Sequence, residues 1–106
     1  MKRNLKKSLL YFDGKTLTEN KNGKDTPILI CDVLAKAMFE VSTSVGLSPD
    51  EKYLAFKISR RIVANPEAVD LESADVVLIR KIITPSFSAG IYGQIVDLLE
   101  DNQQLT

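Results

Sequence analysis

The amino-acid sequence predicts a mostly α-helical fold with a small N-terminal β-hairpin, an α+β chain built as a compact bundle of about four helices. Apolar residues recur at helical spacing in segments after residue 27, and most of these segments are bounded by residues typical of helix ends. Before them, Asp13-Gly14 separates two short strand-like stretches. A length of 106 residues, 44% hydrophobic and 26% charged, corresponds to one globular domain.

This single domain, residues 1–106, divides into five parts. They are a basic arm (1–7), a hairpin (8–18), a loop (19–26), the helical body (27–100) and a tail (101–106). Charge is distributed unevenly, because residues 1–24 hold seven cations and two acids (+5), whereas the remainder holds seven cations and twelve acids (−5). The arm is therefore expected either to dock on its own acidic body or to meet an acidic partner, nucleic acid or protein.

The sequence indicates a cytoplasmic protein. Its one cysteine, Cys31, can form no disulfide within the chain and fits a reducing compartment. The apolar run that follows the basic start, Leu9–Phe12, is too short for a signal-peptide core or a membrane span.

Two turn signals organise the N-terminal part. Asp13-Gly14 predicts the turn of the hairpin at residues 8–18, because both positions of a favoured two-residue turn need positive φ. The polar stretch after it contains Asn22-Gly23 and is interpreted as a loop. Thr26-Pro27 then resembles an N-cap followed by proline at the first helical position, which predicts a helix over residues 27–42. This helix is apolar around most of its circumference, so it is expected to be central, with Cys31 buried in it.

The second helix has the best-defined ends. Ser48, Pro49 and Glu51 form a capping box with proline at the first position, and Asn65-Pro66 ends the helix because a residue before proline avoids the helical region. The segment at 73–84 is rich in β-branched residues, yet its acidic lead-in and basic end favour a helix. The final segment, 87–100, has one apolar side.

The second helix also carries the main candidate site. Tyr53, Lys57, Arg60 and Arg61 fall on one arc, and no acid lies three or four residues from the cations. An aromatic ring among cations is typical of a nucleic-acid surface. The same cations also suit the C-terminal end of a helix, where they oppose its dipole, and the acidic connection after it can fold back on them. Both interpretations stay open.

Gly90 and Gly93 form a second candidate surface, together with Asp97 on the same side of the last helix. Glycine disfavours the helix interior by about 1 kcal/mol, so two glycines on one side call for a reason. Either Gly90 is simply an N-terminal position, or another backbone approaches this side from within the fold or from a partner.

Enzymatic functions are disfavoured. The chain has no histidine, which removes the commonest general base and the commonest metal ligand. No spaced-glycine phosphate loop or calcium-loop pattern is present. No catalytic, cofactor-binding or metal-ligating residue is therefore predicted, and no cofactor.

Four stretches resemble a known class of proteins. They are "TPILICDVLAKAMF", "SPDEKYLAFKISRRI", "VDLESADVVLIRKII" and "GIYGQIVDLLE". Their order is similar to that in small, mostly uncharacterised accessory proteins of tailed bacteriophages and prophages. The resemblance implies a viral accessory protein in a bacterial cytoplasm, with no reaction and no catalytic residue, and it also favours a helix at residues 73–84.

Two functional hypotheses follow. The first is a non-enzymatic protein-interaction module, a phage-encoded accessory protein that binds a host or viral protein, with Gly90, Gly93 and Asp97 among its contacts. The alternative is a small nucleic-acid-binding regulator that uses the basic arm and the surface from Tyr53 to Arg61. No membrane partner is expected, and the sequence leaves the oligomeric state open.

Overall fold

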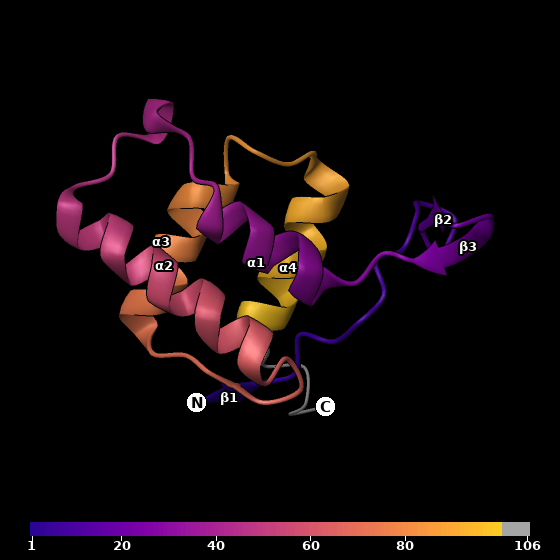
Figure 1. Cartoon of the computed structure of the whole chain (residues 1–106), viewed down its shortest axis with the longest axis horizontal. Helices are drawn as coiled ribbons and strands as arrows, with labels where there is room; N and C mark the ends of the chain where they lie inside the picture. The colour runs from indigo at the N-terminus through magenta and orange to yellow at the C-terminus, as the bar shows by residue number, and fades with distance from the viewer. Residues whose placement is uncertain (101–106) are drawn as a thin grey trace.

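The computed structural model describes residues 1–100 and confirms the α+β class, with a body of four α-helices (Figure 1). The helices are α1 (Ile30–Phe39), α2 (Pro49–Ala64), α3 (Ser73–Ile83) and α4 (Ala89–Glu100), with a short 3-10 helix, η1, at Thr43–Val45. The strands are β1 (Lys2–Arg3), β2 (Thr18–Lys21), β3 (Lys24–Pro27) and β4 (Val69–Asp70). They form two separate antiparallel pairs, β1 with β4 and β2 with β3. The predicted tail, 101–106, lies outside the described residues.

Helix α1 is central to the core, as its apolar circumference predicts. It contacts both α2 and α3, and it contributes five buried side chains, those of Ile30, Cys31, Leu34, Ala35 and Met38. The hydroxyl of Ser59 on α2 is buried against it and donates a 2.9 Å hydrogen bond to the Ala35 carbonyl oxygen. This bond satisfies a polar group that would otherwise be costly to bury.

The helix predictions hold for three of the four segments. Helix α2 begins after Ser48 with the expected capping box and ends at Ala64, with Asn65 as the residue that caps it. The ambiguous segment at 73–84 is a helix, α3, and α4 begins two residues later than expected. Within residues 1–100, no helix is both long and apolar enough to cross a membrane.

The prediction of a first helix over 27–42 was wrong at both ends. Thr26 and Pro27 belong to β3, and α1 begins only at Ile30, after Leu29, whose side chain makes no capping bond. The backbone just before α1 is used in extended pairing instead, because the Ile28 N–H donates to the Leu17 carbonyl oxygen at 2.9 Å. At the other end, Glu40 has left the helical conformation and caps α1.

The region expected to be a loop at 19–26 is instead the regular hairpin of β2 and β3. Asn22 and Gly23 both have positive φ, 53° and 80°, as a tight two-residue hairpin turn requires. The hairpin predicted at 8–18 is shorter and less regular, with one isolated bridge between Leu10 and Thr16. The tight two-residue turn predicted there needs positive φ at both positions, and only Gly14 has it. The turn is therefore wider than expected. The two turns together project from the helical body (Figure 1).

The basic arm at 1–7 docks on its own body, which was one of its two expected roles. Strand β1 pairs with β4, and Arg3 donates a 3.1 Å hydrogen bond to the Leu99 carbonyl oxygen. Leu5 is fully buried, and Lys6 forms an exposed ion pair with Glu67. Part of the arm's charge is therefore engaged within the chain.

Candidate interaction surface

Helix α2 is held at its N-terminal end by side-chain bonds. The Glu51 N–H donates to Ser48 Oγ at 3.1 Å, and the Ser48 N–H donates to Glu51 Oε1 at 2.9 Å. Lys81 of α3 also pairs with the Glu51 carboxylate at 3.1 Å. The hydrogen bond from the Ser48 backbone and the one from Lys81 both lower the pKa of Glu51 below its ordinary value.

Arg61 is held against the fold by its side-chain bonds, although 37% of its side chain is exposed. Its Nη1 donates to Asp75 Oδ2 at 3.0 Å and to the Asp70 carbonyl oxygen at 2.7 Å. The Asp75 side chain is only 6% exposed, and the same Oδ2 accepts the Glu72 N–H at 2.9 Å. The fold-back of the acidic connection onto the helix end is thus confirmed for Arg61, which ties α2 to β4 and α3.

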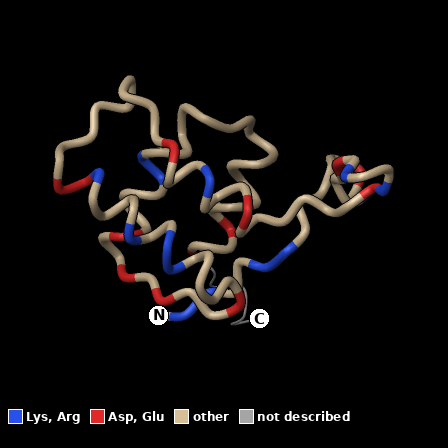
Figure 2. The backbone as a smooth tube through the Cα atoms, viewed as in Figure 1, with Lys and Arg blue, Asp and Glu red and all other residues tan. Residues whose placement is uncertain are grey.

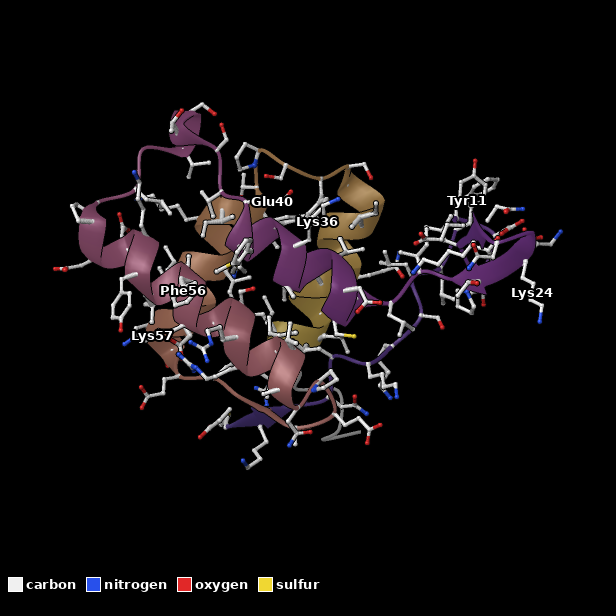
Figure 3. All side chains as sticks on the ribbon, viewed as in Figure 1. Tyr11, Lys24, Lys36, Glu40, Phe56 and Lys57 are labelled. Carbon is white, nitrogen blue, oxygen red and sulfur yellow. The ribbon has the colours of Figure 1, made fainter. Side chains whose placement is uncertain are left out.

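The other members of the predicted surface, Tyr53, Lys57 and Arg60, lie on the outer side of α2. Two phenylalanines, Phe39 and Phe56, lie beside them. Lys57 Nζ lies 4.9 Å from the centre of the Tyr53 ring, and the Arg60 guanidinium lies 5.6 Å from the centre of the Phe56 ring. Tyr53 and Phe56 are stacked with ring centres 6.3 Å apart, and Phe39 of α1 lies 6.4 Å from Phe56. Figure 3 labels Phe56 and Lys57 on the outer side of α2.

We call this region the α1–α2 surface. It consists of Phe39, Lys52, Tyr53, Phe56, Lys57 and Arg60. Phe39 and Tyr53 are 65% and 61% exposed, far more than large aromatic side chains usually are in a monomer. A hollow of about 210 Å³ opens between the two helices, with Phe39 and Phe56 among its lining residues and Lys52 at the α2 side.

The α1–α2 surface is cationic. Within residues 1–100, the structure shows no carboxylate paired with Lys52, Lys57 or Arg60. The first turn of α2 holds two acids, Asp50 and Glu51, of which Glu51 is engaged with Lys81. Figure 2 shows the Lys and Arg positions that follow one another along α2. The surface thus offers exposed aromatic rings beside positive charges that the fold leaves unneutralised.

The structure does not bring Gly90, Gly93 and Asp97 to this surface. They lie on α4, where a Cβ added at either glycine would meet no other atom within 4 Å. A close approach of another backbone from within the described fold, one of the reasons considered for these glycines, is therefore excluded. Asp97 is exposed on the same helix. Gly90 borders a different hollow, near the hairpin tip.

Sequence reasoning missed Phe39 and Phe56 as members of the site. Phe56 could have been found, because it is three residues after Tyr53 and four before Arg60, which places it on the same arc. Phe39 could not, because the predicted helix ran on to residue 42 and made it one more core position. Its exposure follows from the actual end of α1 at this residue.

The described residues show no constellation for catalysis. Cys31 is 4% exposed, and burial raises the pKa of its thiol, which keeps it protonated and unreactive at neutral pH. Within residues 1–100, no group of three or more Asp, Glu, Cys or His side chains is placed to hold a metal ion.

No protein-family model matches the chain, and neither a curated protein nor a solved structure is similar enough to match it.

Proposed function

We propose that the protein is a non-enzymatic interaction module that binds a partner protein through the α1–α2 surface. The observation that carries the proposal is the exposed ring cluster of Phe39, Tyr53 and Phe56 beside Lys57 and Arg60. Aromatic side chains and arginine are the residues that contribute most binding energy at protein interfaces. The rigid start of α2 holds these side chains in place before binding, which reduces the entropy lost on association.

The chemistry of the surface defines the partner. The hollow of about 210 Å³ suits one large apolar side chain, and the cations of α2, of which Lys52 lines the hollow, suit carboxylates next to that side chain. We therefore infer a partner segment with an apolar anchor residue flanked by aspartate or glutamate. The resemblance to phage accessory proteins supports a setting in a bacterial cytoplasm, with a host or viral protein as this partner.

A nucleic-acid-binding regulator is the second candidate, and the aromatic rings among cations are the observation that favours it. Two features count against it. Lys57 and Arg60 lie over the Tyr53 and Phe56 rings, where a base would have to stack. Arg61 and part of the arm's charge, which were expected to contribute phosphate contacts, are engaged within the chain.

The proposal can be tested by selecting binders from a random peptide library on the immobilised full chain. The enriched peptides should share an aromatic or leucine residue flanked by acids. Phe39→Ser and Arg60→Glu should each weaken their binding by about tenfold or more, because each removes one part of the recognition chemistry. Val77→Ser is the matched control, since Val77 is equally exposed, at 68%, but lies on α3.

A fluorescent single-stranded oligonucleotide, titrated at low and high salt, decides between the two candidates. Salt-sensitive binding that Phe39→Ser and Arg60→Glu abolish would replace the protein partner with a nucleic acid. Enriched peptides that bind both variants as well as the unmodified chain would remove the α1–α2 surface as the site.

A further inference from the structure

A second exposed aromatic surface lies at the opposite side of the fold, where the first turn meets α4. We call it the tip surface; its residues are Leu10, Tyr11, Phe12, Leu17, Ser88, Gly90, Ile91 and Gln94, which together line a hollow of about 390 Å³. Phe12 stands at its rim and is 87% exposed, the most exposed of the large apolar side chains in residues 1–100. Figure 3 shows Tyr11 at this projecting end of the molecule.

The tip surface is held in shape by hydrogen bonds. The Gln94 side chain accepts the Leu10 N–H through Oε1 and donates to the Leu10 carbonyl oxygen through Nε2, both at 2.8 Å. Across the turn, the Tyr11 N–H donates to the Lys15 carbonyl oxygen at 2.7 Å. The Tyr11 and Phe12 rings contact each other edge to face, with centres 4.6 Å apart. The backbone that carries the exposed aromatic residues is thus held against α4.

Gly90 keeps the hollow of the tip surface open. It is the second residue of α4, so the N-terminal position considered for it in the sequence is confirmed. A Cβ added at Gly90 would enter open space rather than the fold. Because Gly90 lines the hollow, a larger side chain at this position would fill it.

The charge of the tip surface indicates what fills it. Its lining residues include no lysine, arginine, aspartate or glutamate. The turns around it carry three acids and three lysines, which balance; they are Asp13, Glu19, Asp25, Lys15, Lys21 and Lys24. Such a surface does not repel an identical one, and it offers no charge to attract an acidic or a basic partner.

We infer that the tip surface binds a second copy of this chain. It carries both a protruding apolar side chain, Phe12, and an apolar hollow beside it. In a two-fold dimer the same surface on both subunits must be self-complementary, so Phe12 of each copy enters the hollow of the other at Gly90 and Ile91. This dimer leaves the α1–α2 surface, on another part of the molecule, open for a different partner.

Sedimentation equilibrium of the full chain, from about 1 μM to about 1 mM, tests the inference over the range of a weak to moderate dimer. We expect a reversible monomer–dimer equilibrium. Phe12→Ser removes the inserted side chain, and Gly90→Leu fills the hollow. Each should raise the dimer dissociation constant about tenfold or more. Phe39→Ser is the control, because it removes an exposed phenylalanine from the α1–α2 surface and should leave the constant unchanged.

Three results would overturn the inference: a monomer over the whole concentration range, a dimer that persists in both variants, or a dimer lost in Phe39→Ser. Because Phe12 makes few contacts in the monomer, Phe12→Ser should keep the circular dichroism spectrum and melting temperature of the unmodified chain. If Gly90→Leu fails this folding check, Phe12→Ser alone decides. Peptide binding at the α1–α2 surface is measured separately, so failure of one idea leaves the other standing.

Discussion

The α1–α2 surface and the tip surface both expose aromatic rings, but they differ in charge. The first places Lys52, Lys57 and Arg60 around its rings, whereas the lining of the second has no charged residue. Two copies of the cationic surface would repel each other, so it suits a different, acidic partner. Two copies of the uncharged surface would not. Charge, more than apolar area, therefore distinguishes the surface proposed for another protein from the surface inferred for a second copy.

The two surfaces are also built differently. The α1–α2 surface lies on two helices that meet in the core, and α2 is fixed by a capping box and an ion pair to α3. The tip surface combines a hydrogen-bonded turn with the start of α4, and the Gln94 side chain joins the two. Stability changes in the helical body should therefore affect the first surface more directly than the second.

The largest effect we expect concerns Arg61. The fold uses this cation of α2 for stability, whereas we propose that its neighbour Arg60 binds the partner. Arg61→Gln should lower the free energy of unfolding by about 2–3 kcal/mol, because the nearly buried Asp75 carboxylate loses its ion-pair partner at 3.0 Å. Urea denaturation measures this change. Arg60→Gln, the matched control one residue earlier, should change stability by about 0.5 kcal/mol or less.

Peptide binding should show the reverse order, with Arg60→Gln weakening it and Arg61→Gln leaving it unchanged in the folded protein. Equal losses of stability in the two variants would mean that the inward position of Arg61 is wrong. A loss of binding confined to Arg61→Gln would extend the α1–α2 surface toward β4.

The sequence predicted the parts of the fold that depend on local signals. The capping box at Ser48 and Glu51 and the stop at Asn65 define α2 through contacts only a few residues apart. The start of α1 was predicted wrongly, because the Ile28 N–H bonds to Leu17, a partner that Thr26-Pro27 does not reveal. Pairing with distant backbone decided the outcome there, and a local pattern carries no record of it.

The candidate site was predicted in part for the same reason. Tyr53, Lys57 and Arg60 share an arc of one helix, which helical spacing alone reveals. Arg61 shares that arc, yet Asp75, fourteen residues away, draws it inward. Of the tip surface, the sequence analysis singled out only Gly90, because the surface requires Leu10 and Gln94 to meet across 84 positions of the chain.

The next largest effect we expect concerns the stability of α4 at Gly93. Gly93→Ala should raise the free energy of unfolding by about 1 kcal/mol, because alanine favours the helix and its Cβ meets no atom within 4 Å. Thermal unfolding would detect the gain. Gly93 does not line the hollow of the tip surface, so the dimer dissociation constant should stay the same. A lost dimer would place Gly93 inside the contact, and a lower melting temperature would mean that its surroundings are not open.

The smallest effect we expect comes from Glu51, whose capping box holds the start of α2 and so belongs to one of the two surfaces only. The pKa of Glu51 is lower in the folded protein than its ordinary value, mainly through the Ser48 N–H and then Lys81. A lowered folded pKa adds stability above the unfolded value of about 4.3, and this stability is lost as pH falls through the folded pKa. Urea denaturation from pH 6 down to about pH 3 should therefore show a shallower loss of stability with acid in Glu51→Gln than in the unmodified chain.

Glu40→Gln is the control, because the structure shows no partner for the Glu40 carboxylate within residues 1–100. The tip surface does not include Glu51, so Glu51→Gln should leave the dimer dissociation constant at neutral pH unchanged. Identical acid slopes for the two variants would mean that the capping box does not hold α2 as the structure shows. A weaker dimer in Glu51→Gln would mean that the tip surface depends on the start of α2.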